Sequence, residues 1–194
     1  MKILDNIKEE LQNLANEDIA RHSQRFFKTA KGEYGEGDIF LGIRVPLLRT
    51  LVKKHHYITL PQCEILLDST FHEQRLLALL MMVRLYEKGK TLQKNEVFDA
   101  YVHNTRFINN WDLVDSSAHK IVGAQLLNGD KALLYEFVHS QNLWERRIAI
   151  FSTMHFIQNN HFEDTLQISA ILLHDPEDLI HKAVGWMLRE IGKR

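Results

Sequence analysis

Four side chains in the second half of the chain have the chemical types of a reactive site: Trp111, Asp115, Arg147 and Trp186. An ionised carboxylate stabilises developing positive charge by electrostatics, and the face of a tryptophan ring also attracts a cation. A guanidinium group offers an anion a planar fork of hydrogen-bond donors. If the fold brings these side chains together, they suit a reaction that passes through a cationic intermediate.

An internal repeat supplies a reason for them to meet. Four related tetrads recur at offsets of 35, 36 and 35 residues: 66–69 (LLDS), 101–104 (YVHN), 137–140 (FVHS) and 172–175 (LLHD). We expect each tetrad to end one helix and to be followed by a short link and a longer amphipathic helix. A two-helix unit at this period is typical of HEAT-type repeats. The sequence therefore predicts an all-α, HEAT-like solenoid with a concave face, forming one domain over residues 1–194.

The repeat register aligns the unusual residues in rows. The first row contains Trp111, Arg147 and Lys182, with Arg75 added if one residue is gapped, and the second row, four residues later, contains Asp115, Phe151 and Trp186. Residues four apart on a helix lie on the same face. The second helices of neighbouring repeats are therefore expected to bring Trp111, Asp115, Arg147 and Trp186 into one patch.

Each of these residues also has an ordinary structural explanation. A tryptophan at helical spacing usually packs in a core, and an arginine on a helix is usually solvated or paired with a carboxylate. Asp115 could interact favourably with the dipole of its helix in the early turns, and Asp112 is the better candidate for the helix cap. Taken singly, these readings do not predict an aromatic ring, a carboxylate and a cation at matched repeat positions.

Other candidate sites are weaker. The 11 histidines are scattered, and the pair His55-His56 lacks an acidic partner at metal-ligand spacing. His103, His139 and His174 recur with the tetrads, so we expect them to make structural contacts between helices. Cys63 is the one cysteine and is expected to be a packed thiol. The glycine-rich loop at 31–38 has neither the preceding strand nor the Gly-Lys-Ser/Thr of a nucleotide site. The sequence thus indicates no metal and no cofactor.

The charge is unevenly distributed along a chain of ordinary globular composition, with 45% hydrophobic and 25% charged residues. The net charge is −1, yet residues 21–57 carry eight Lys and Arg against three acids, and residues 161–178 carry five acids and no Lys or Arg. Such a distribution can provide a basic face for phosphates, although mixed, solvated helix surfaces explain it equally well. No apolar stretch is long enough to span a membrane, so we expect a cytoplasmic protein.

Four segments resemble the AlkD-like DNA alkylation repair family. They are GEYGEGDIFLGIRVP at 32–46, WDLVD at 111–115, WERRIAI at 144–150 and KAVGWMLRE at 182–190. Matches in order extend over about residues 25 to 191, which is nearly the whole chain. The HEAT-like fold of that family agrees with the repeat.

The resemblance implies a metal-free DNA glycosylase that excises positively charged N3- and N7-alkylpurines from duplex DNA. It assigns the catalytic carboxylate to Asp115, the two cleft tryptophans to Trp111 and Trp186, and the phosphate contact to Arg147, with Arg146 as the alternative. The remaining expected DNA-contacting residues are Lys182, Arg75 and Phe26. Two departures are visible: Phe26 stands where a family member has a cleft tyrosine, and the chain stops at Arg194, where relatives usually continue through a further basic helical segment. We expect a monomer that acts in base excision repair.

Two other functions remain open on the sequence. Relatives that lack the catalytic residues point to a non-enzymatic binder of damaged or branched DNA, and HEAT-type arrays also serve as protein-interaction scaffolds. Trp111, Asp115, Arg147 and Trp186 favour the enzyme over the first alternative. A strong dependence of duplex binding on salt concentration would argue against the second.

Overall fold

The computed structural model describes residues 2–194, and every regular element in this range is a helix. The α-helices are α1 Lys2–Leu14, α2 Glu17–Phe26, α3 Val45–Lys54, α4 Leu60–Leu67, α5 His72–Lys88, α6 Thr91–His103, α7 Trp111–Ala118, α8 Ala124–Leu126, α9 Ala132–Val138, α10 Leu143–Gln158, α11 Glu163–Ile171 and α12 Asp178–Gly192. The expected all-α class is confirmed. Among these residues, Ile39 and Phe71 also form an isolated parallel β-bridge.

The helices follow the order that the tetrads predict. The tetrads at 66–69, 101–104 and 137–140 lie at the ends of α4, α6 and α9, and the fourth tetrad directly follows α11. After each tetrad the chain turns into a longer second helix or helical run, namely α5, α7 to α8, α10 and α12. The sequence period therefore corresponds to one helical hairpin.

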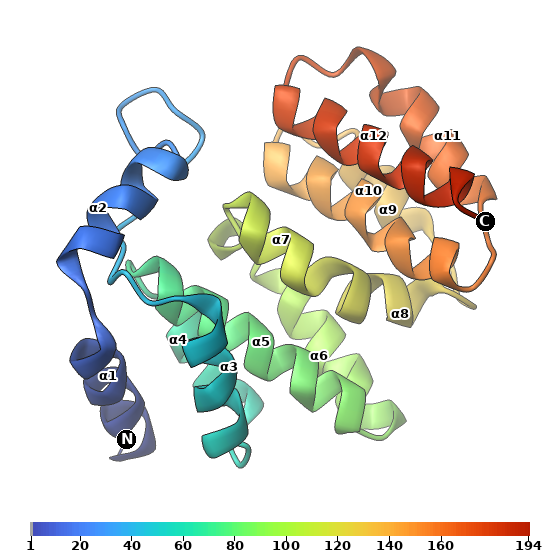
Figure 1. Ribbon diagram of the computed structural model, residues 1–194. Helices are drawn as coiled ribbons and strands as arrows, with labels where there is room; N and C mark the ends of the chain where they lie inside the picture. The colour runs from blue at the N-terminus through green and yellow to red at the C-terminus, as the bar shows by residue number, and fades with distance from the viewer. Residues whose placement is uncertain (1) are drawn as a thin grey trace.

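The second helices pack in chain order. Helix α7 contacts both α5 and α10, and α10 in turn contacts α12. Figure 1 shows α7, α10 and α12 side by side, with α9 and α11 in a second layer behind them. Because equivalent helices are neighbours, a residue of one repeat lies beside its counterpart in the next repeat.

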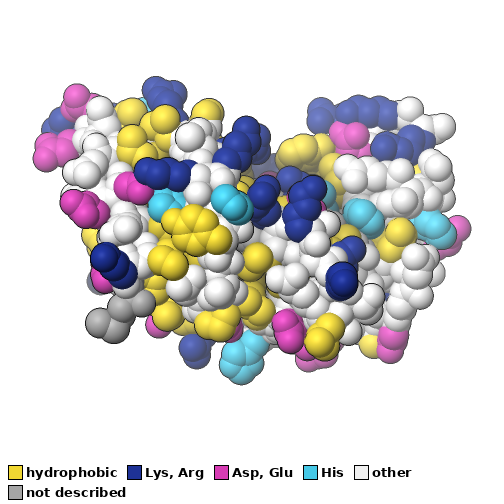
Figure 2. All heavy atoms as spheres, turned by 90° about the horizontal axis from the view of Figure 1, so that it is seen from below, with side chains coloured by type: hydrophobic (Ala, Val, Ile, Leu, Met, Phe, Trp, Pro, Cys, Tyr) yellow, Lys and Arg dark blue, Asp and Glu magenta, His cyan; other side chains and the backbone are white. Residues whose placement is uncertain are grey.

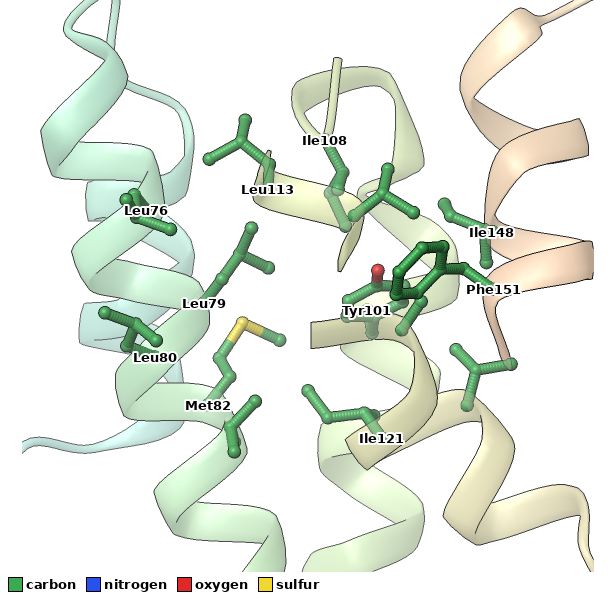
Figure 3. Close-up of a cluster of buried hydrophobic side chains, with 14 of the residues drawn as sticks. Leu76, Leu79, Leu80, Met82, Tyr101, Ile108, Leu113, Ile121, Ile148 and Phe151 are labelled. Atoms are coloured by element: carbon green, nitrogen blue, oxygen red, sulfur yellow. The ribbon is translucent and has the colours of Figure 1, made fainter. Parts of the chain in front are cut away.

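The core extends between the two layers and along the array. Helix α5 is buried on nearly all sides, and Leu76, Leu79 and Met82 belong to the cluster that Figure 3 shows between α5 and the helices after it. The buried Tyr101 lies in this cluster, where its hydroxyl group is 3.0 Å from Ser117 Oγ. A buried phenol requires such a partner, because an unpaired buried hydroxyl group is costly. This packing fixes α7, which carries two of the candidate site residues.

A long connection from Phe27 to Arg44 joins α2 to α3. Its end is held by Glu73, whose buried carboxylate accepts hydrogen bonds from the backbone N–H groups of Leu41, Gly42 and Ile43 at 2.8, 2.7 and 3.1 Å. Gly42 has a φ of +80°, and a Cβ atom there would lie 2.1 Å from the carbonyl oxygen of Asn16. Glycine is therefore required where the connection crosses the start of α2.

Helix α7 runs into a π-helical turn at His119–Gly123 before α8 begins. At the end of this turn a Cβ atom on Gly123 would lie 2.2 Å from the carbonyl oxygen of Ser152. Because Gly123 has no side chain, the backbone that follows α7 packs closely against α10. π-Turns within helices occur frequently near functional sites, and this one begins four residues after Asp115.

Candidate active site

The first two turns of α7 present Trp111 and Asp115 on one face. The helix begins after Asn110, whose side-chain oxygen accepts a hydrogen bond from the backbone N–H of Trp111 at 2.8 Å. The prediction that Asp112 caps this helix is wrong, because its carboxylate instead bonds His72 Nε2 at 2.8 Å. The spacing of four residues aligns Trp111 with Asp115.

Asp115 and Arg147 form a two-point ion pair between adjacent repeats. Arg147 Nε donates to Asp115 Oδ1 at 2.8 Å and Nη2 donates to Oδ2 at 2.7 Å. Arg147 Nη1 donates to the backbone carbonyl of Leu179 at the start of α12, and the guanidinium carbon lies 5.5 Å from the centre of the Phe151 ring. Arg147 is only 4% exposed. The carboxylate therefore has one fixed orientation, which parallel N–H···O bonds impose.

The pKa of Asp115 is raised above the ordinary value of an aspartate. Burial raises this pKa most, the hydrogen bond and charge of Arg147 lower it, and the nearby Asp112 raises it further. Burial thus outweighs the ion pair. Asp115 is therefore protonated at a higher pH than an exposed aspartate.

Two tryptophans flank this pair. Trp111 is half-buried, with its ring 5.1 Å from Phe27 in a stacked arrangement and 5.9 Å from Phe26. Trp186 on α12 is 41% exposed and lies edge-on to Phe151 at 5.3 Å. Each ring therefore packs on one side and leaves surface available to a ligand.

These side chains line a cleft with a volume of about 640 Å³. Its lining residues are Phe26, Lys28, Gly32, Glu33, Tyr34, Trp111, Asp115, Arg147, Glu177, Asp178, Leu179, Lys182 and Trp186. Figure 2 shows a hollow in the upper outline of the molecule between its N-terminal and C-terminal parts, with Lys and Arg side chains on both sides. The structure thus brings together Trp111, Asp115, Arg147 and Trp186, as the repeat register predicts.

Two further predicted residues also line the cleft. Phe26 at the end of α2 is 58% exposed, and Lys182 on α12 is exposed and lies 2.6 Å from the carboxylate of Asp178. Two acids of the segment 161–178 form ion pairs: Asp175 binds Arg146, and Asp178 binds Lys182. Their charge is therefore partly offset by local ion pairs.

Arg75 and Arg146 do not line the cleft. Arg75 is 4% exposed and binds Asp38 and the backbone carbonyl of Ser69, whereas Arg146 binds Asp175 and the backbone carbonyl of Ser140. Each arginine thus binds an aspartate and the backbone carbonyl of the serine six residues before it. The two arginines are 71 residues apart, which equals two repeats without a gap. The gapped alignment of Arg75 with Arg147 is wrong, and the guanidinium groups of Arg75 and Arg146 are occupied by structural contacts.

Tyr34 is a cleft residue that the sequence reasoning missed. Its hydroxyl group lies 3.4 Å from the backbone oxygen of Phe26, and its ring lies edge-on to Trp144 at 6.1 Å. The pKa of Tyr34 is raised by burial, an effect that a hydrogen bond with Trp111 opposes. The residue comes from the non-repetitive connection after α2, so the repeat register could not place it. The glycines around it, at 32, 35 and 37, were the available signal of a special loop.

The remaining predictions concern residues away from the cleft. Cys63 is buried and its pKa is raised by burial to about 12, so a packed thiol is confirmed. His103, His139 and His174 are exposed, and the expectation of contacts between helices is wrong for them. Within residues 2–194, no group of three or more His, Cys, Asp or Glu side chains is placed to hold a metal ion. Over the same range, no helix has the length and apolar character needed to cross a membrane.

Comparison with known proteins assigns the chain to a family. The family described as DNA alkylation repair enzyme matches residues 7–194. The chain belongs to this family. Membership places the protein among enzymes of DNA alkylation repair and implies DNA as its partner.

A solved structure supports the fold assignment of this family member. It is described as a predicted DNA alkylation repair enzyme from Enterococcus faecalis, and it superposes with a TM-score of 0.69 at 20% sequence identity. The superposition covers 92% of this chain and 84% of the other. At this identity the likeness shows the fold alone. A search of curated proteins found no match.

Proposed function

We propose that the protein is a DNA glycosylase that removes N3- and N7-alkylated purines from duplex DNA. The observation that carries the proposal is the carboxylate of Asp115, held by Arg147 in a cleft between Trp111 and Trp186. A fixed anion next to exposed aromatic faces suits a transition state in which positive charge develops on a sugar. Membership of a DNA alkylation repair family agrees with such a substrate.

The reaction needs little acid catalysis. Alkylation at N3 or N7 gives the purine a positive charge, so the bond between C1′ and the base breaks with its electron pair moving to the base, which leaves neutral. The sugar becomes oxocarbenium-like, and water then adds to C1′ and loses a proton. Asp115, when ionised, stabilises the sugar cation and can orient the water and accept its proton.

The aromatic residues and cations have supporting roles in this scheme. Trp111 and Trp186 would pack against the deoxyribose and stabilise its charge through their ring faces. Arg147 lines the cleft and uses three of its five N–H bonds for Asp115 and Leu179, so its main role is to hold the carboxylate. The exposed Lys182 adds a cation on the same cleft, and the exposed Lys and Arg residues of 21–57 add further charge for the duplex backbone.

The test is release of 7-methylguanine from a duplex that contains one such base. The purified protein is incubated in excess with this duplex, and free base is separated and quantified over time, with an undamaged duplex of the same sequence as the control. We expect base release from the damaged duplex alone. Tight binding of the damaged duplex without release would contradict the proposal and support a non-catalytic DNA binder.

A further inference from the structure

A buried histidine lies between two carboxylates beneath the cleft. His72, the first residue of α5, is 1% exposed, with Nδ1 2.9 Å from Asp38 Oδ2 and Nε2 2.8 Å from Asp112 Oδ2. Asp38 also binds Arg75 and accepts a hydrogen bond from the side-chain amide of Asn110 at 3.0 Å. The cluster therefore joins the connection after α2, the start of α5 and the start of α7.

The geometry of this cluster requires a protonated imidazole. A carboxylate at neutral pH only accepts hydrogen bonds, so both ring nitrogens must donate. Burial by itself lowers the pKa of His72, but Asp112 and Asp38 more than offset it and raise the pKa to about 9. His72 is thus a cation at neutral pH. Its contribution to stability is present below the ordinary histidine pKa and is lost as the pH rises through about 9.

The cluster borders the candidate active site through two routes. Asp112 lies on α7 between Trp111 and Asp115, and Asn110, the cap of α7, is held by Asp38. The His72 ring also stacks on Phe40 at 4.4 Å and lies 5.2 Å from Phe27, whose ring in turn stacks on that of Trp111. A displacement of His72 would therefore reach Trp111 through both the backbone and the aromatic stack.

We propose that His72 is a positioning residue for the site. Its imidazolium, shared between Asp38 and Asp112, fixes the first turn of α7 and balances the charge of Asp112 beside Asp115. This inference rests on the proposed function only for its kinetic readout, because the orientation of α7 and the charge state of Asp115 can be measured without a substrate.

The electrostatic part of the inference has a definite sign. Asp112 and Asp115 are three residues apart on α7, and the charge of Asp112 raises the pKa of Asp115. The other charged or titratable groups near Asp115 are Arg147 on α10, Tyr101 on α6 and His119 in the π-helical turn. Those that line the same cleft are Lys28, Glu33, Tyr34, Glu177, Asp178 and Lys182. Removing the His72 cation leaves Asp112 unbalanced and raises the pKa of Asp115, whereas removing the Asp112 charge lowers it.

Two substitutions test this sign in opposite directions. In His72→Gln the acid limb of base release should move to higher pH, and in Asp112→Asn it should move to lower pH. Because a small displacement of catalytic groups slows chemistry strongly, His72→Gln should also slow single-turnover release by about 10-fold at neutral pH, with little change in duplex affinity. The matched control is His55→Gln, since His55 is likewise buried and bonded to a carboxylate, that of Glu10. We expect the control to lower stability without moving the limb.

A second measurement separates this inference from the proposed function. The carboxyl carbon of Asp115 is titrated by carbon-13 NMR in the wild type and in both variants, without DNA. Opposite displacements in the two variants support the role of His72 even if the wild type releases no base, which would refute the glycosylase proposal alone. An unchanged titration in both variants overturns the inference. If His72→Gln does not fold, the ring nitrogens of His72 are titrated by nitrogen-15 NMR in the wild type: an imidazolium at neutral pH supports the inference and a neutral ring refutes it.

Discussion

Replacement of Asp115 by asparagine removes the charge of the proposed catalytic carboxylate while keeping its shape. A carboxylate about 4 Å from a unit positive charge stabilises it by about 4 kcal/mol at an effective dielectric constant of about 20. The sugar carries less than a full charge in the transition state, so we expect a loss of about 3 to 4 kcal/mol. At 1.36 kcal/mol per factor of ten, base release should slow by about 10² to 10³-fold.

Duplex binding should behave differently from the rate. Arg147 is 4% exposed and its guanidinium is paired with Asp115, so Asp115→Asn leaves a cation unbalanced next to the cleft. A polyanion is then bound at least as tightly as by the wild type. The assay combines single-turnover release of 7-methylguanine with duplex affinity measured by fluorescence anisotropy, both at neutral pH.

The matched control for this variant is Asp175→Asn. Asp175 also pairs with an arginine across a repeat boundary, with 2.6 Å between its Oδ2 and Arg146 Nε, but it lies outside the cleft. The control should lower the melting temperature without slowing base release. Release by Asp115→Asn at the wild-type rate would refute the catalytic role of Asp115. An equal loss of rate in both variants would show that the effect comes from stability instead.

Three further predictions concern pH, salt and substrate. Arg147→Gln removes the group that lowers the pKa of Asp115, so the acid limb of the rate should move to higher pH; an unmoved limb would contradict the ion pair. Lys182→Gln should reduce the slope of log affinity against log salt by about one unit. Arg146→Gln should leave the slope unchanged, because the guanidinium of Arg146 is bound to Asp175. Equal slopes for the two variants would contradict the assignment of the cleft. Release of 3-methyladenine or 7-methylguanine should be much faster than that of the neutral lesion 1,N6-ethenoadenine, and comparable rates would require a proton donor.

The sequence predicted the helical class and the repeat because both follow from local periodicity. Apolar spacing fixes which face of each helix is buried, and a period of 35 to 36 residues fixes which helices are equivalent. Since equivalent helices pack side by side, the proximity of Trp111, Asp115, Arg147 and Trp186 follows from register alone. The same reasoning failed for Arg75. Without a gap Arg75 aligns with Arg146, and the assumed one-residue gap placed it in the row of Arg147 instead.

Only the tertiary structure decided how these side chains are used. The two-point pairing of Asp115 with Arg147, the occupation of Arg146 by Asp175 and the position of His72 between two carboxylates all join residues 29 to 40 positions apart. Such contacts depend on side-chain rotamers and on the non-repetitive connection from Phe27 to Arg44, which has no period to read. The repeat places a residue on a face, whereas burial and its partners determine whether its charge is free for a ligand.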